Sequence, residues 1–236
     1  MPYWLTAVNI YCERTDTSFW SEPINALTNL AFLIAAGLLW SRAQGQGEVR
    51  LLAILIGLIG LGSFLFHTFG NRLTGLLDMF FIAAFIVAFA YLVPRVSWQQ
   101  TRWRALGTMV LALSFMAGTT ALVGNWRATL DWLPPGIYLG AWLMLLIYAP
   151  LTRRLGPAAK VGPSASRFIW CAASLFAVSM GARQLDMPLC LSTGGLHWLW
   201  HLCNACVLWA CARAIQYPNQ ARQTQRTETF ADRVGS

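Results

Sequence analysis

The sequence predicts an all-α membrane protein, a seven-transmembrane helix bundle with its N-terminus outside and its C-terminus in the cytoplasm. Composition is the first observation: 57% of the 236 residues are hydrophobic and 11% are charged, which is too apolar for an ordinary water-soluble domain. The second is the presence of seven apolar runs long enough to cross a hydrocarbon core of about 30 Å, which takes about 20 helical residues. The third is an uneven distribution of basic residues between alternate loops.

The expected spans follow one another along the chain, separated by polar loops or loops that contain glycine or proline. Strands of a membrane β-barrel alternate in hydropathy over about 10 residues, whereas these runs are apolar on all sides, so helices are favoured. Residues 1–216 are expected to form this bundle, and the polar segment 217–236 a disordered cytoplasmic tail. The spans are expected at roughly 23–40, 51–69, 73–93, 105–123, 135–151, 168–182 and 195–215.

Basic residues set the predicted orientation. Of the 17 Lys and Arg residues, 13 fall in the first, third and fifth loops or the C-terminal tail, and 4 fall on the opposite side. Because cytoplasmic loops carry an excess of Lys and Arg, the N-terminus is expected outside. Nucleic-acid binders instead concentrate basic residues on a soluble face, so the net charge of +8 reflects topology and no nucleic-acid partner is expected.

The three histidines of the chain all fall in expected spans. His67 lies near the outer end of the second span, and His197 and His201 lie in the first turns of the seventh. Four residues apart, the latter two share one helical face and can bind one ion. Three imidazoles leave a fourth tetrahedral position for water, as in catalytic zinc sites, and nothing redox-specific favours copper or iron. The alternative is three separate interhelical hydrogen bonds, but ionisable groups in membranes are usually functional.

Two further polar residues lie at the same expected depth. Asp78 is the one acidic residue deep in an expected span, and near a metal-bound water it can act as general acid and base. It can equally orient a histidine or form a plain interhelical hydrogen bond. Ser63, four residues before His67, shares its face and can donate to a developing oxyanion. A serine in a membrane helix also commonly bonds its own backbone.

This combination of residues resembles the alkaline ceramidases and the wider seven-helix hydrolase superfamily that includes the adiponectin receptors. The resemblance consists of Ser-x-x-x-His on the second span, an Asp early in the third and His-x-x-x-His on the seventh. It also covers the N-terminal stretches 11–13 and 20–29, and thus nearly the whole chain except the tail. The matching site residues are Ser63, His67, Asp78, His197 and His201.

The resemblance implies an intramembrane zinc-dependent amidase that cleaves the N-acyl bond of ceramide or a related N-acyl lipid. In that scheme the histidines hold Zn²⁺, Asp78 handles protons, Ser63 assists at the oxyanion and apolar helix faces line the acyl-chain pocket. The substrate is a lipid of the surrounding bilayer, and the active site lies in the outer half of the membrane.

The resemblance also implies two features of the outer side. A Ca²⁺ site would use Glu13 and Glu22, with Asp16 as a middle ligand, since hard oxygen ligands suit calcium. The alternative is that these acids form a solvated N-terminal segment. Cys12 and Cys190 fall on the outer side, where disulfides are permitted, and the resemblance implies that they are bridged.

Two other classes of function compete with the enzyme. One is a zinc-containing seven-helix lipid receptor or sensor without turnover, and the other is a metal or proton transporter. The polar residues occupy one depth with no relay to the opposite face, which disfavours transport. At the outer end of the sixth span, Arg183 and Asp186 are expected either to form an ion pair or to shape the mouth of the pocket.

Overall fold

The computed structural model describes residues 2–126, 134–156 and 161–234, and within these ranges it consists of helices and loops without a β-strand. Among the described residues seven helices are long, and four elements are short: η1, α1, η2 and α8. The elements in chain order are η1 (Tyr3–Leu5), α1 (Pro23–Thr28), α2 (Leu30–Arg42), α3 (Gly47–Phe69), α4 (Arg72–Leu92), η2 (Val93–Ser97), α5 (Arg102–Trp126), α6 (Gly136–Leu155), α7 (Val161–Leu185), α8 (Cys190–Thr193) and α9 (His197–Val234).

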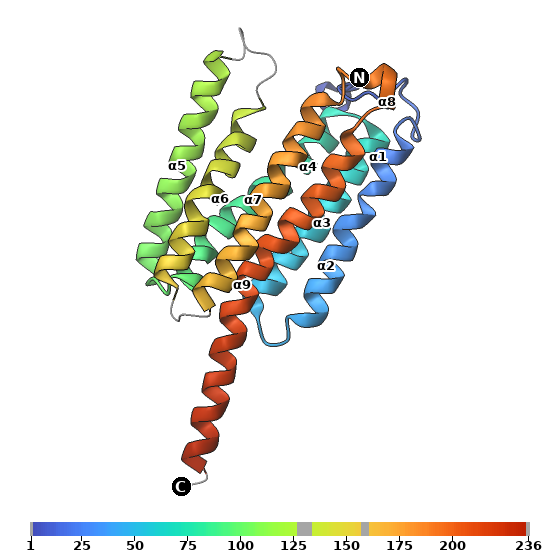
Figure 1. Cartoon of the computed structure of the whole chain (residues 1–236). Coiled ribbons are helices and arrows are strands. Elements are labelled where there is room, and N and C mark those ends of the chain that lie inside the picture. The colour runs from blue at the N-terminus through green and yellow to red at the C-terminus, as the bar shows by residue number, and fades with distance from the viewer. Residues whose placement is uncertain (1, 127–133, 157–160, 235–236) are drawn as a thin grey trace.

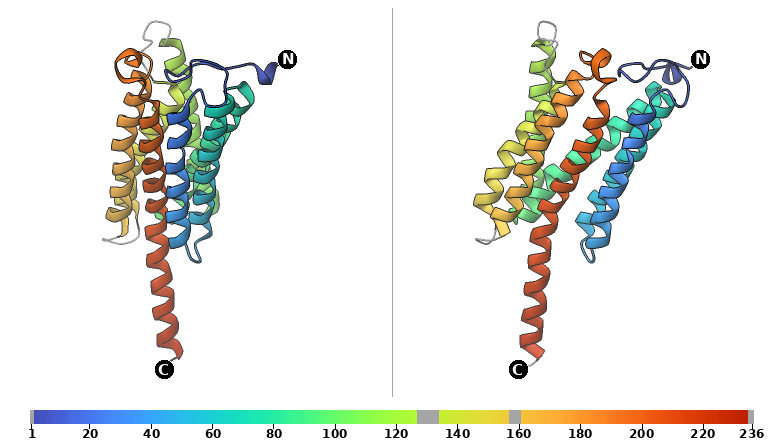
Figure 2. Two further views of the ribbon diagram at one scale, coloured as in Figure 1. Left: turned by 90° about the vertical axis from the view of Figure 1, so that its right-hand side faces the viewer. Right: turned by 45° about the vertical axis from the view of Figure 1, so that its right-hand side comes forward.

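The long helices form one closed bundle in chain order (Figure 1). Each packs against the next, from α2 against α3 through to α7 against α9, and α9 returns to contact α2. The N-terminal segment, α8 and the start of α9 lie together at one end of the bundle. From the other end α9 continues alone beyond its neighbours, as both views of Figure 2 show. The all-α fold is therefore confirmed.

Six helical segments among the described residues are long and apolar enough to cross a membrane, and they coincide with the first six expected spans. Their outward faces carry large apolar side chains such as Leu111, which is 72% exposed. Such faces suit contact with lipid rather than water. Helix α9, which contains the seventh expected span, is not among the six. They are Pro23–Arg42, Gly47–Phe69, Arg72–Ser97, Arg102–Asn125, Gly136–Leu155 and Gly162–Leu185.

A tight reversal joins α3 to α4 beside the predicted site. Helix α3 ends at Gly70, whose φ of +54° is a left-handed conformation that favours glycine. Asn71 then caps α4: its side chain accepts a hydrogen bond from the Thr74 backbone N–H at 3.0 Å, and the Thr74 hydroxyl accepts one from the Asn71 N–H at 3.3 Å. This turn brings the last turn of α3 alongside the first turns of α4.

Apolar packing fills the part of the bundle distant from the N-terminal segment. Leu39 near the end of α2, Leu52 near the start of α3 and Ile215 far along α9 are fully buried there, and Phe89 is 2% exposed. The buried histidines and buried acidic residues instead lie at the end where the chain begins, whereas the buried polar residues of the opposite end, such as Thr152 and Gln216, are uncharged.

The polar tail, which was expected to be disordered, is helical as far as the structure describes it. Helix α9 continues without a break in its assigned range to Val234, through Pro218; residues 235–236 lie outside the described residues. The prediction weighed polarity alone, yet Gln and Arg, each present three times after Pro218, have high helix propensity. A segment too polar for a packed core can therefore still extend an existing helix.

One prediction concerns the crossing of α2 and α3. A Cβ atom added to Gly60 would lie 2.8 Å from the Phe32 Cβ and 3.2 Å from the Asn29 carbonyl oxygen, whereas one added to Gly57 would meet nothing closer than Ala36 at 3.8 Å. Gly60→Ala is therefore expected to lower the free energy of unfolding by about 1–3 kcal/mol relative to Gly57→Ala, through overpacking. Both changes gain the same helix propensity, so equal melting temperatures of the two variants in detergent would contradict the close approach.

Candidate metal centre

Three buried histidines meet at the end of the bundle where the chain begins. His67 lies in the last turn of α3, and His197 and His201 lie in the first two turns of α9. Their ligand atoms are all within 4.8 Å of one another. Each residue is 2% exposed or less. The predicted convergence of the histidines from two distant parts of the chain is thus observed, and the group can hold one metal ion.

The hydrogen bonds of the rings leave lone pairs directed at the centre of this group. His67 Nδ1 lies 2.6 Å from a Glu22 carboxylate oxygen and His201 Nδ1 lies 2.9 Å from the Thr28 hydroxyl. That hydroxyl donates to backbone carbonyls of α1, so it accepts the proton of His201 Nδ1. Three further ring nitrogens, His67 Nε2, His197 Nδ1 and His201 Nε2, are buried without partners among the described residues. Buried polar atoms are rarely left unpaired, and a metal ion satisfies all three together.

Glu22 is the centre of the hydrogen-bond network around His67. Its carboxylate is buried, contacts the Arg14 guanidinium and accepts from Asn25 Nδ2 at 3.0 Å as well as from the His67 ring. Burial alone would raise the pKa of Glu22, but the hydrogen bond and charge of His67, with Asn25 and Arg14, outweigh burial and lower it. Glu22 is therefore an anion that orients a metal ligand.

The predicted calcium residues do not come together. Glu13 accepts from the backbone N–H groups of Ile24 and Asn25 at 2.7 and 2.8 Å and so caps α1. Asp16 is exposed and accepts from the Ser18 N–H at 2.8 Å. Hydrogen bonds to Ser18 lower the pKa of Asp16. Among the described residues, the histidine group is the cluster that could hold a metal, and the three acids form none.

Arg14 supplies the positive charge in this region. The guanidinium contacts the Glu22 carboxylate, donates to the Asp16 carbonyl oxygen at 3.4 Å and donates to the His67 carbonyl oxygen at 2.9 Å. It lies against Gly70, where an added Cβ would be 2.4 Å from it. The carboxylate and carbonyl oxygens that could bind a calcium ion here therefore contact the Arg14 guanidinium instead.

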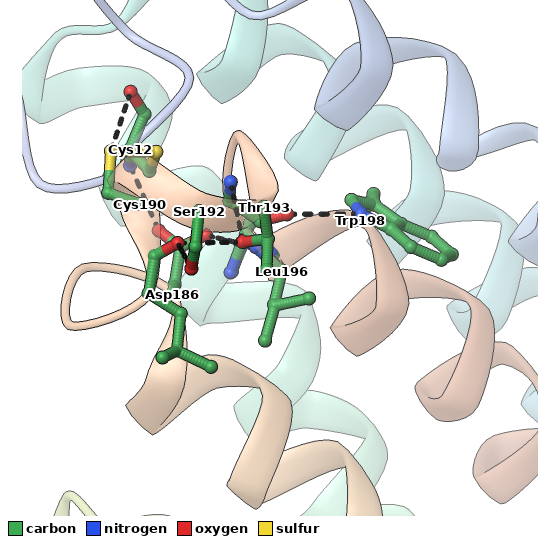
Figure 3. The surroundings of a disulfide bond; sticks show 10 residues. Cys12, Asp186, Cys190, Ser192, Thr193, Leu196 and Trp198 are labelled. Carbon is green, nitrogen blue, oxygen red and sulfur yellow. Dashed lines mark hydrogen bonds between the residues drawn. A yellow bond between two sulfur atoms is a disulfide. The ribbon is translucent and has the colours of Figure 1, made fainter.

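The start of α9 is held by Asp186, which follows α7 (Figure 3). One carboxylate oxygen accepts from the N–H groups of Leu196 at 2.7 Å and His197 at 2.9 Å, and the other accepts from the Cys12 N–H at 2.9 Å. Acidic groups stabilise a helix N-terminus in this way. Asp186 thus fixes the turn that carries two metal ligands, and it makes no ion pair with Arg183 among the described residues.

The predicted disulfide is present beside this contact. Cys12 and Cys190 are bonded across a sequence separation of 178 residues. Gly195, with φ of +101°, passes so close that an added Cβ would lie 2.9 Å from the Asp186 carboxylate and 3.0 Å from the Cys12 Cβ. The N-terminal segment is therefore attached covalently to the loop that leads into α9.

A cavity of about 260 Å³ opens beside the histidines between α3, α4, α6, α7 and α9. His197, His201, Ser63 and Asp78 all face it, and the Ser63 hydroxyl donates a hydrogen bond to the Asp78 carboxylate. The structure thus gathers the residues that the sequence placed at one depth. Most of the remaining lining is apolar: Phe32, Ile59, Phe66, Met79, Ile82, Phe85, Ile86, Phe89, Ala141, Met144, Leu145, Phe176, Val207 and Leu208.

The sequence did not predict the roles of several residues that the structure places at the site. The Tyr11 ring stacks on the His197 ring, with centroids 3.6 Å apart. Burial raises the pKa of the Tyr11 phenol, so it stays protonated near neutral pH. Thr28 orients His201. Tyr11 and Thr28 fall within the N-terminal stretches of the family resemblance, which was their one signal. Arg183, expected either to pair with Asp186 or to shape the mouth of the pocket, lines the cavity.

Comparison of the chain with protein-family models, with curated proteins and with solved structures found no match.

The role of Glu22 gives a prediction about metal affinity. Glu22→Gln removes the negative charge that orients His67 while keeping the shape of the side chain. We expect the affinity for zinc to fall about 10- to 100-fold, the usual effect of losing such a partner, in a competition titration with a chromophoric chelator. Glu48→Gln is the matched control, because Glu48 lies in the first turn of α3, at the opposite end from His67. Wild-type affinity in Glu22→Gln would contradict this role.

The position of Arg14 gives a prediction about calcium. Calcium addition or selective calcium chelation is expected to leave the melting temperature of the wild-type protein unchanged, because a guanidinium already neutralises Glu22. Arg14→Ala is expected to cost about 3 kcal/mol of unfolding free energy, since it leaves a buried carboxylate without its cation. Thermal denaturation with and without calcium measures both effects. A calcium-dependent rise in the wild-type melting temperature would show that Arg14 does not replace the ion.

Proposed function

We propose that this chain is an intramembrane zinc-dependent amidase that hydrolyses the N-acyl bond of ceramide or a related N-acyl lipid. The products are a sphingoid base or another amine and a free fatty acid. One observation carries the proposal: three buried histidine nitrogens without partners lie beside an apolar cavity that also contains a carboxylate. A structural role for the histidines would not require that cavity.

The histidines fit zinc better than a harder ion. Three neutral imidazoles are typical of catalytic zinc sites, whereas magnesium and calcium prefer oxygen ligands. Zinc, when bound, supplies a Lewis acid for the amide carbonyl and activates water. Glu22 and Thr28 hold two of the rings in the tautomer that presents Nε2, so the ligands are oriented before an ion arrives.

Asp78 is the residue proposed to move the proton. In hydrolysis, water adds to the acyl carbon, the bond between carbon and nitrogen breaks, and one proton of water ends on the leaving nitrogen. Asp78 faces the cavity beside Ser63 and can take that proton and return it. Ser63, which already donates to Asp78, is placed to donate to the carbonyl oxygen as negative charge develops.

The cavity and the membrane placement support a lipid substrate. Its lining of aliphatic and aromatic side chains suits an acyl chain, and the polar groups are confined to the end near the histidines. We propose that α9 is the seventh span and that the end bearing the disulfide lies outside the cytoplasm, where disulfides persist. The basic loops then lie on the cytoplasmic side, as the positive-inside rule requires.

A second candidate is a zinc-containing lipid receptor or sensor without turnover. The observation in its favour is α9 itself, which starts at the histidines and runs as one helix beyond the opposite end of the bundle (Figure 2). A change in the lipid at the site would act on a helix that reaches the cytoplasm. This candidate predicts lipid binding without release of fatty acid.

The test is release of fatty acid from a panel of N-acyl lipids that includes ceramide. The purified full chain is expected to release fatty acid, and a zinc chelator is expected to stop it. Asp78→Asn is expected to lower kcat by about 100-fold or more, with zinc content unchanged, because it removes the proton carrier alone. His197→Ala is expected to lose both zinc and activity.

Asp16→Asn serves as the control, because Asp16 is an exposed acid outside the cavity. Lipid binding with no release from any member of the panel would favour the receptor or sensor. Full activity after zinc removal would refute the proposed chemistry.

A further inference from the structure

A guanidinium faces the apolar cavity with no carboxylate of the described residues in ion-pair contact with it. Arg183, near the end of α7, is the one Arg or Lys among the described residues that line the cavity. The ion pairs of the described residues are Arg14 with Glu22 and Glu22 with His67, so neither nearby aspartate lies within ion-pair distance of Arg183. Its Nε atom is buried and has no hydrogen-bond partner.

The two aspartates near Arg183 are directed elsewhere. Both carboxylate oxygens of Asp186 accept hydrogen bonds from backbone N–H groups, those of Cys12, Leu196 and His197. Asp78 accepts from Ser63 on the α3 side of the cavity. The guanidinium and the Asp78 carboxylate therefore face the same space from different walls without contact.

Aromatic rings hold the guanidinium close to the metal group. Its central carbon lies 5.3 Å from the Tyr138 ring centroid and 5.7 Å from that of Trp200. Tyr11, whose ring stacks on His197 at 3.6 Å, lines the same cavity and interacts electrostatically with the guanidinium. The Tyr11 ring thus connects the cation with a candidate metal ligand, and the aromatic rings orient the guanidinium without supplying an anion.

A guanidinium in a mainly apolar cavity, without a carboxylate in direct contact among the described residues, is costly unless a ligand supplies an anion. A planar guanidinium binds a carboxylate through two parallel hydrogen bonds. We propose that Arg183 binds a carboxylate of the lipid in this cavity. The inference rests on the proposed amidase function, which it narrows to N-acyl amino acids as the substrate class.

In an N-acyl amino acid the carboxylate is one carbon from the amide nitrogen. A substrate held by Arg183 therefore keeps its carbonyl near the histidines and its acyl chain in the apolar part of the cavity. The carboxylate of a released fatty acid has the same chemistry, so both sources need to be compared.

The experiment compares pairs of ligands with the same chain length, in which one member carries a carboxylate and the other a neutral hydroxyl group. N-palmitoylglycine is compared with N-palmitoylethanolamine, and palmitate with hexadecanol, for displacement of a fluorescent acyl probe from the zinc-loaded full chain before measurable turnover. Hydrolysis of the two amides is followed in parallel as kcat/KM. The variants are Arg183→Gln, which removes the charge, and Arg183→Lys, which keeps a charge without the planar fork.

Arg72→Gln is the matched control, because it removes a cation at the same end of the bundle that contacts Tyr3 and Thr6 and does not line the cavity. The wild type and Arg72→Gln are expected to prefer N-palmitoylglycine over N-palmitoylethanolamine by about tenfold or more, the effect of one charge-assisted pair. Arg183→Gln is expected to abolish that ratio, and Arg183→Lys to keep part of it.

Each outcome separates this inference from the proposed function. Discrimination in binding with no hydrolysis supports the role of Arg183 and refutes the amidase. Hydrolysis without discrimination, or an equal loss for both amides in Arg183→Gln, overturns the role of Arg183 and leaves the amidase standing. If Arg183→Gln weakens palmitate alone and leaves the ratio of the amides unchanged, the carboxylate belongs to the product and the N-acyl amino acid class is overturned.

Discussion

The contact between the buried carboxylate of Glu22 and the ring of His67 is the interaction on which the site depends. A carboxylate removed from water needs charge and hydrogen bonds in return, and here Arg14, Asn25 and His67 provide them. Because the anion is satisfied on three sides, it fixes the His67 ring with Nε2 directed inward. The same geometry explains why an N-terminal loop packs against a membrane bundle: the loop contributes both the anion and the cation.

The N-terminal segment is consequently part of the site rather than a leader to the first span. It contributes Tyr11 to the ring stack, Arg14 to the Glu22 pair and Cys12 to the disulfide. Asp186 joins this segment to the start of α9 through backbone hydrogen bonds. Hydrogen bonds and a disulfide therefore join the N-terminal segment to α8 and the start of α9 at one end of the bundle.

Sequence reasoning predicted the helices and the histidine group because both depend on local patterns, namely long apolar runs and a spacing of four residues. Asp78 and Ser63 followed from the same depth argument and do face the cavity. Arg14 and Thr28 have no such pattern, since their partners lie in other elements and only packing selects them. For Arg183 the sequence left an ion pair and the mouth of the pocket as alternatives, and the structure places it in the cavity lining. The calcium residues illustrate the limit: three acids close in sequence point to different donors.

The candidate metal ligands lie on α3 and on α9, the last helix, and the disulfide joins Cys12 to Cys190 in α8, just before it. Both connections therefore need the C-terminal part of the chain. During synthesis His67 and Glu22 precede the other two histidines by most of the length of the chain. The histidine group is therefore complete only after α9 has been made, and a chain interrupted before α9 lacks two of its three imidazoles. Formation of the candidate site is thereby coupled to completion of translation.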